Sequence, residues 1–163
     1  GFGSGIISIE LAKVFPTSKW LAFDSSLEAY ICATSNAKQQ DVTTIEWVNE
    51  PFHLNHPSIQ STSLPRICIA NPPYIPSDDI ATLETSVAQY EPRAALDGGP
   101  TGLDAYHIIF KACAEQGIAL ICLECGVGQS ETLKALATHY TYRCCNTVTD
   151  MQGIERVIVF ERD

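Results

Sequence analysis

"GFGSGIISIELAKVFPTSKWLAFD", residues 1–24, is the stretch that decides the fold. Its glycine-rich turn runs directly into an apolar helical pattern over residues 5–15, and Pro16 ends that helix. A short buried strand follows and ends at Asp24. Glycines at positions 1, 3 and 5 let a ligand approach the backbone at the positive end of the helix. We therefore predict a turn, helix and strand with a ligand site at the turn.

The spacing of Asp24 indicates what that ligand is. Asp24 lies 21 residues after Gly3, a distance at which an acidic side chain at a strand end binds both hydroxyls of a ribose. The pattern G-x-G-x-G, rather than G-x-G-x-x-G, argues against a dinucleotide. These features predict an adenosine-containing ligand. The alternative is a tight turn with an unrelated surface aspartate.

Helical and strand patterns alternate along the rest of the chain. A helix is predicted over residues 27–38, with Leu27, Tyr30, Ile31 and Thr34 on one side. The other predicted elements are strands at 44–48, 66–70, 118–125, 142–150 and 155–161 and helices at 102–115 and 129–138. This order predicts an α/β fold with a doubly wound, mainly parallel sheet whose last two strands run antiparallel. At 163 residues, we expect one domain over positions 1–163.

Composition limits the partners and the compartment. A net charge of −9 argues against direct nucleic-acid binding and favours a protein or small-molecule partner. The chain shows no basic, apolar leader, and its longest apolar runs are too short to span a bilayer, so we expect a cytoplasmic domain with no membrane partner.

The cysteines and histidines do not predict a metal site. Seven cysteines, an odd number scattered through apolar segments, fit reduced core thiols. Cys122 and Cys125 form C-x-x-C within a predicted strand, where residues three apart point to opposite faces. His53 and His56 lie in a polar segment and are interpreted as surface residues. We therefore predict no bound metal.

The segment "RICIANPPYIP", residues 66–76, ends a strand with Asn71-Pro72-Pro73-Tyr74. A residue before proline is forced into an extended conformation, so Asn71 and Pro72 are held rigidly at the strand end. Two acceptors result, the Asn71 side-chain oxygen and the Pro72 carbonyl, and the ring of Tyr74 packs nearby. Such a site binds a planar NH2 group. The alternative is a Pro-Pro strand terminator.

Two acceptors on one NH2 group fix the nitrogen and direct its lone pair at an electrophile. A sulfonium methyl donor already carries a good leaving group, so no acid–base residue is demanded. Its positive charge disperses in the transition state, and a dry pocket of proline and aromatic rings does not oppose the transfer. The motif therefore predicts methyl transfer to an amide or amine nitrogen.

These residues resemble the class I S-adenosylmethionine-dependent methyltransferases, and specifically the release-factor glutamine N5-methyltransferases of the PrmC/HemK type. The resemblance covers nearly the whole chain. Besides the glycine turn, Asp24 and the Asn-Pro-Pro-Tyr motif, it rests on "YEPRAALDGGPTGLDAYHII" (90–109), "LECGVGQ" (123–129) and "DMQGIERVIVF" (150–160). The Glu91-Pro92 block is the part most specific to the glutamine enzymes.

The resemblance implies strand order 3-2-1-4-5-7-6, S-adenosyl-L-methionine as cofactor and S-adenosyl-L-homocysteine as product. It assigns cofactor binding to Gly1, Phe2, Gly3, Ser4, Gly5, Asp24, Glu50, Pro51 and Asn71, and catalysis to Asn71, Pro72, Pro73 and Tyr74. Glu50 and Pro51 depart from the family's usual Asp and apolar residue beside the adenine. The substrate implied is the glutamine amide in the Gly-Gly-Gln motif of peptide chain release factors.

The resemblance also implies an N-terminal truncation before or within the first strand, since the family motif begins with an acidic residue two positions before Gly1, preceded by a central strand and a helical domain. We expect unpaired backbone groups in the middle of the sheet and marginal stability of these 163 residues alone. Two other functions stay open. One is a DNA or RNA base N-methyltransferase, because an exocyclic amine offers the same two hydrogens, and the other is a non-catalytic fragment with the fold only.

Several polar residues of the resembling segments have structural and catalytic interpretations. We favour structural roles, such as buried ion pairs that hold loops, for Glu91-Pro92, Asp104 and Arg156. Glu124 ends a strand and Gln129 begins a helix beside the predicted site. Helix capping is the simpler interpretation of these two residues, and support of the site is the alternative.

Overall fold

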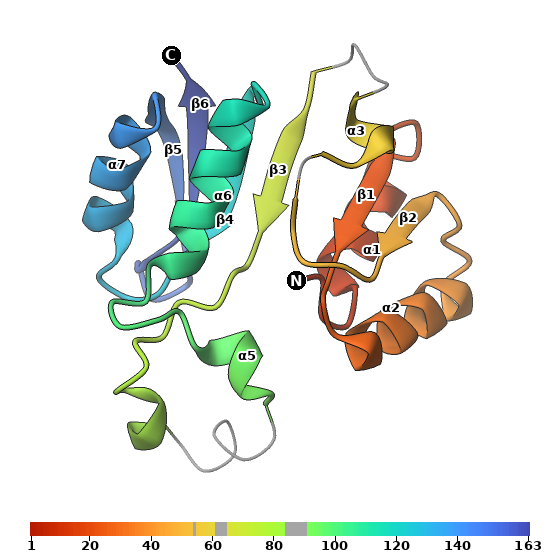
Figure 1. The fold of residues 1–163 in the computed structure, drawn as a ribbon, viewed down its shortest axis with the longest axis horizontal. Coiled ribbons are helices and arrows are strands. Elements are labelled where there is room, and N and C mark those ends of the chain that lie inside the picture. Colours follow the sequence, from red (N-terminus) through yellow and green to blue (C-terminus); the bar gives the residue numbers. More distant parts are fainter. Residues whose placement is uncertain (54, 61–64, 84–90) are drawn as a thin grey trace. The chain divides into compact units, whose positions relative to one another are not determined.

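The computed structural model describes residues 1–53, 55–60, 65–83 and 91–163. The chain forms two compact units, Gly1–Thr62 and Ser63–Asp163 (Figure 1). The assignment of residues 1–163 to one catalytic domain stays a prediction.

The first unit follows the predicted order of helices and strands. Its elements are α1 (Ile6–Val14), β1 (Trp20–Phe23), α2 (Leu27–Gln39), β2 (Ile45–Val48) and α3 (Pro57–Gln60). The strands β1 and β2 pair in parallel, with Trp20 opposite Ile45 and Phe23 opposite Val48. A parallel pair places the carboxyl ends of both strands at one edge, and residues that follow both strands therefore meet there.

The core of the first unit shows which face of α2 is buried. Leu27 and Ile31 are 57% and 60% exposed, whereas Ala33 and Ala37 are buried. The reason is the close approach of the glycine turn, because a Cβ at Gly5 would lie 2.9 Å from the Cβ of Ala33. Only small side chains fit at such a contact, so packing rather than hydrophobicity selects the inner face.

The second unit contains a mixed four-stranded sheet. Its elements are β3 (Ile67–Ala70), η1 (Ile80–Thr82), α5 (Arg93–Leu96), α6 (Asp104–Glu115), β4 (Leu120–Glu124), α7 (Ser130–His139), β5 (Tyr142–Thr149) and β6 (Glu155–Arg162). The strand order is β3-β4-β6-β5, with β3 parallel to β4 and β6 antiparallel to both neighbours. The antiparallel final pair is confirmed, and within each unit the strand neighbours agree with the expected order.

One face of this sheet carries the main core. Ile121, Leu123, Ile158 and Phe160 are fully buried, and Phe110 of α6 meets Phe160 edge to face with ring centroids 5.1 Å apart. The strand β3 is an edge strand of the sheet, and its Ile67 and Ile69 are 56% and 40% exposed. Marginal stability of the isolated chain stays a prediction.

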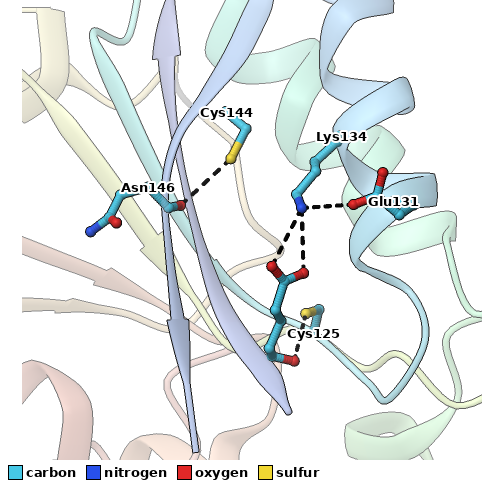
Figure 2. Close-up of polar contacts among 6 residues, drawn as sticks. Cys125, Glu131, Lys134, Cys144 and Asn146 are labelled. Carbon is cyan, nitrogen blue, oxygen red and sulfur yellow. Dashed lines mark hydrogen bonds and ion pairs between the residues drawn. The ribbon is translucent and has the colours of Figure 1, made fainter. Parts of the chain in front are cut away.

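Polar contacts fasten α7 to β6 beside this core, and Figure 2 shows them. The Lys134 ammonium lies 2.7 Å from a carboxylate oxygen of Glu131 and 3.3 Å from one of Glu155. The Cys125 thiol donates to the Glu155 carbonyl over 3.7 Å, and burial raises the pKa of that thiol. Cys125 is therefore a structural core thiol, and all seven cysteines are free.

Among the residues with described positions, no helix is long and apolar enough to cross a bilayer.

Candidate active site

The glycine turn of the first unit is anchored on the end of β1. The Phe2 N–H donates to the Phe23 carbonyl over 3.0 Å, and the Phe2 ring meets Trp47 edge to face at 4.9 Å. Gly3 and Gly5 have φ angles of 52° and 80°, which glycine adopts without steric cost. Gly5 is the N-cap residue of α1. The turn therefore brings the first N–H groups of α1 to the carboxyl edge of the strand pair.

Asp24 fastens this turn to the start of α2. One carboxylate oxygen accepts the Gly3 N–H at 2.9 Å, and the other accepts the Ser26 N–H at 2.9 Å. A Cβ at Gly1 would lie 2.8 Å from the same carboxylate, so a side chain there would require the Asp24 carboxylate to shift. Each carboxylate oxygen keeps a lone pair beyond these single bonds, and Asp24 can still accept from hydroxyl groups.

The end of β2 lies beside Asp24. The Asn49 side chain donates to the Asp24 carbonyl at 3.0 Å, and the Asp24 N–H donates to the Val48 carbonyl at 3.1 Å. Glu50 and Pro51 follow directly and are exposed. Glu50 Oε2 lies 2.9 Å from a ring nitrogen of His53. All residues that the sequence assigned to the cofactor within this unit therefore gather at one strand edge.

An aromatic cluster that the sequence analysis missed stands at the same edge. Phe52, His53 and His56 surround Phe23 with ring centroids 5.8, 5.3 and 5.9 Å from it. The side chains of His53 and His56 are 37% and 20% exposed, so both histidines reach the surface and also pack against this ring. His53 Nδ1 is buried, with no hydrogen-bond partner in the described chain. The sequence signal for this cluster is the aromatic Phe23 directly before Asp24, because all three rings pack against it.

These features fit an adenosine-containing group. They supply a carboxylate, the first N–H groups of α1, aromatic surface and an unpartnered buried ring nitrogen. In the described parts of the chain, no group of three or more His, Cys, Asp or Glu side chains is placed to hold a metal ion.

In the second unit, Asn71 to Tyr74 follow β3 directly, as predicted. Pro72 is buried, whereas Asn71 is exposed. The Asn71 side chain has no hydrogen-bond partner within the described residues and remains available as an acceptor. Burial, and to a smaller extent the Glu124 carboxylate, raises the pKa of the Tyr74 phenol, which stays neutral.

The segment after Tyr74 is braced by residues 96–99. The Ile75 N–H donates to the Leu96 carbonyl at 3.0 Å, and the Gly98 N–H donates back to the Ile75 carbonyl at 2.8 Å. Asp97 accepts the Ser77 hydroxyl at 2.6 Å, and this bond is the main reason why the pKa of the Asp97 carboxyl is lowered. Tyr90, at the start of the resembling block, lies outside the described residues.

Two glycines of this block pack against the motif backbone. A Cβ at Gly98 would lie 2.9 Å from the Pro73 carbonyl oxygen, and a Cβ at Gly102 would lie 2.3 Å from the Tyr74 carbonyl oxygen. Any side chain at either position would displace the loop. The requirement for glycine at both positions therefore comes from the close approach of the Asn-Pro-Pro-Tyr backbone.

Gln129 links three loops in this region. Its side-chain oxygen accepts the Gly126 N–H at 2.9 Å, and its NH2 group donates to the carbonyls of Tyr74 at 2.9 Å and Gly102 at 3.4 Å. Gln129 is the N-cap residue of α7, but its side chain makes no capping hydrogen bond. The capping interpretation of Gln129 is therefore wrong, and the alternative, support of the site, describes its contacts.

Among the charged residues of the resembling segments, Arg156 and Asp150 hold a turn. Arg156 Nε lies 3.0 Å from Asp150 Oδ2, and the other Asp150 oxygen accepts the Ile154 N–H at 3.0 Å, which closes the β5–β6 turn. This pair is about one-third exposed, so the ion pair is only partly buried. Glu91, Pro92 and Asp104 are exposed.

A groove of about 360 Å³ lies beside Tyr74 in the second unit. It is lined by Tyr74–Pro76, Asp79, Thr101, Leu103, Gly126–Gln129 and Thr132. Of the Asn-Pro-Pro-Tyr motif, Tyr74 is the residue that lines this groove.

No family model matches the chain. The fold is similar to those of Rossmann-like class I methyltransferases in solved structures. The hMettl16 catalytic domain in complex with a MAT2A 3′UTR hairpin superposes with a TM-score of 0.70 at 14% identity, over 99% of this chain and 61% of that one. The ribosomal protein L11 methylase from Lactobacillus delbrueckii gives 0.57 at 17% identity, over 100% and 67%. The predicted fold class is confirmed.

Curated relatives are more similar in sequence. A release factor glutamine methyltransferase from Geobacter sulfurreducens is 34% identical over 161 residues, 97% of this chain and 55% of the relative. One from Gloeobacter violaceus is 36% identical over 163 residues, 98% of this chain and 56% of the relative. The chain thus spans a little over half the length of these relatives. Over nearly all of its own residues, the chain is therefore similar to a little over half of each of these release factor glutamine methyltransferases.

Proposed function

We propose that the chain carries the catalytic core of an S-adenosyl-L-methionine-dependent methyltransferase that modifies the side-chain amide nitrogen of a release-factor glutamine in the Gly-Gly-Gln motif. The observation that carries the proposal is the exposed, unpartnered Asn71 amide at the end of β3, set in a braced proline loop. The names of the curated relatives support the substrate. Because release factors act on ribosomes, we place this activity in the cytoplasm.

In the first unit, the Gly1–Gly5 turn and Asp24 would hold the adenosine portion of the cofactor. Asp24 would accept from the ribose hydroxyls with the lone pairs that its bonds to Gly3 and Ser26 leave free. The aromatic cluster around Phe23 would pack beside the purine, with Glu50 and Pro51 at its rim. The cofactor supplies a methyl group on a sulfonium, whose positive charge makes the thioether a good leaving group.

In the second unit, Asn71 and Pro72 would accept the two N–H bonds of the glutamine amide and fix the direction of its nitrogen lone pair. Accepting these hydrogens increases the electron density on nitrogen as the new N–C bond forms and the C–S bond breaks, with its electron pair going to sulfur. The nitrogen then loses one proton to solvent, and the products are N5-methylglutamine and S-adenosyl-L-homocysteine.

Pro72, Pro73 and Tyr74 would give the reacting amide a neutral and largely apolar surround. Pro72 is buried, and the Tyr74 phenol is kept neutral because burial raises its pKa. A neutral, apolar surround does not oppose the dispersal of positive charge during transfer. No general base is required, since the amide proton becomes acidic once the methyl group is attached.

The test is methyl transfer by the full-length protein with a labelled methyl donor and a release factor. We expect label on one glutamine of the wild-type factor and none on a factor whose Gly-Gly-Gln glutamine is replaced with alanine. Persistent labelling of the substituted factor would overturn the proposal. Label that appears instead in RNA or DNA would support a base N-methyltransferase, because the Asn71 and Pro72 acceptors fit an exocyclic base amine equally well.

A further inference from the structure

We propose that Gln129 is a positioning residue for the methyl acceptor. By holding the Tyr74 carbonyl, Gln129 keeps the Asn-Pro-Pro-Tyr loop in the geometry that orients the acceptor amide. The inference rests on the proposed function and names Gln129 as the side chain that supports the Asn-Pro-Pro-Tyr loop. In the sequence, Tyr74 stands between Asn71 and Gln129. No step of the proposed methyl transfer uses the side chain of Gln129.

The loop needs support through its carbonyls because it has few donors. Pro72 and Pro73 lack N–H groups, so neither can be tied down by donating a backbone hydrogen bond. A donor aimed at a carbonyl of the loop must do this work instead. The Gln129 NH2 group is such a donor, 2.9 Å from the Tyr74 oxygen.

The same side chain is itself fixed at its other end. Gln129 Oε1 accepts the N–H of the buried Gly126 at 2.9 Å, and a Cβ at Gly126 would lie 3.0 Å from the Tyr74 ring. The second hydrogen of the NH2 group is directed to the Gly102 carbonyl at 3.4 Å. One amide therefore joins the Tyr74 loop to the loop before α7 and to the glycine loop before α6.

Few other side chains can replace it. Glutamate keeps the acceptor for Gly126 but has no donor when ionised, and its charge would face two carbonyl oxygens. Asparagine is one methylene shorter, and methionine matches the length but lacks both functions. A loop shift of about 1 Å at the acceptor is expected to slow transfer by up to roughly a hundredfold.

The experiment compares Gln129→Glu and Gln129→Met with the matched control Gln152→Glu in the full-length protein. Gln152 is exposed in the β5–β6 turn, and its substitution makes the same change of charge. For both Gln129 variants we expect kcat for methyl transfer to fall by roughly tenfold to a hundredfold. The Kd for S-adenosyl-L-homocysteine should stay within a few-fold of wild type, and the Gln152 control should match wild type in both quantities.

A spectroscopic measurement separates positioning from general destabilisation. The buried, hydrogen-bonded Gly126 amide should be protected from hydrogen exchange in wild type and in Gln129→Glu, which retains the acceptor, and should lose this protection in Gln129→Met. A fall in kcat in both variants, with Gly126 protected in only one, supports the positioning role. If the wild-type protein is active and Gln129→Glu has the same kcat, the positioning role of Gln129 is overturned and the proposed function is unaffected. An inactive wild type would refute the proposed function and the inference that rests on it.

Discussion

Replacing Gly102 with alanine should displace the Asn-Pro-Pro-Tyr loop by a predictable amount. Gly102 is buried and has a φ of 72°, where a side chain costs about 1–2 kcal/mol. The new Cβ would also lie 2.3 Å from the Tyr74 carbonyl oxygen and 2.9 Å from Gln129 Nε2. Relief of this overlap requires the loop to move by roughly 1 Å, at a further cost of about 1–3 kcal/mol.

Gly153→Ala is the matched control. Gly153 has a φ of 79°, but a Cβ there would meet nothing within 4 Å, so it carries the backbone strain without the overlap. The free energy of unfolding, measured by denaturant titration followed by circular dichroism, should therefore fall by about 1–3 kcal/mol more in Gly102→Ala than in Gly153→Ala. The melting temperature should differ by roughly 2–4 °C per kcal/mol.

Activity should separate the two variants further. We expect kcat to fall by up to roughly a hundredfold in Gly102→Ala, because the acceptors at Asn71 and Pro72 move with the loop. The control should retain the kcat of wild type. Equal losses of stability and equal kcat values in the two variants would refute the proposed contact between Gly102 and the Tyr74 carbonyl.

Three further predictions concern the other parts of the site. Because Asn71 is exposed, Asn71→Ala should leave the free energy of unfolding within about 0.5 kcal/mol of wild type. The Kd for S-adenosyl-L-homocysteine should stay within a few-fold of wild type, whereas kcat should fall at least roughly a hundredfold. Equal losses of kcat and cofactor affinity would make Asn71 a cofactor contact. Asp24→Ala should weaken S-adenosyl-L-homocysteine binding by roughly tenfold or more in calorimetry, since it frees the Gly3 and Ser26 amides and removes the ribose acceptors, and unchanged affinity would contradict this. The Arg156 hydrogen bond and backbone amides lower the pKa of the Asp150 carboxyl in the folded protein. The ionised carboxylate therefore stabilises the fold at pH values above its unfolded-state pKa of about 3.9, and this stabilisation is lost as the pH falls through the lower folded-state pKa. In thermal melts over acidic pH, Asp150→Asn should weaken this dependence, and an unchanged dependence would exclude the pair as its source.

Local signals in the sequence determined much of the fold. Proline, glycine and apolar periodicity located the glycine turn, α1, β1 and the start of α2 within a residue or two, because these signals act through backbone conformation of neighbouring residues. The Asn-Pro-Pro-Tyr motif was placed at the end of β3 for the same reason. The antiparallel final strands were also predicted and are confirmed.

Tertiary structure decided the features that depend on residues far apart in the chain. Sequence periodicity grouped Leu27 and Ile31 on one side of α2, but the buried residues are Ala33, which Gly5 approaches closely, and Ala37. The sequence position of Gln129 indicated a helix cap, whereas its partner at Tyr74 is 55 residues away. Hydrogen bonds and packing between distant loops depend on how close the folded backbone brings them. The sequence by itself therefore determined the elements and the chemistry of the motifs, and the tertiary structure decided which side chains hold those motifs in place.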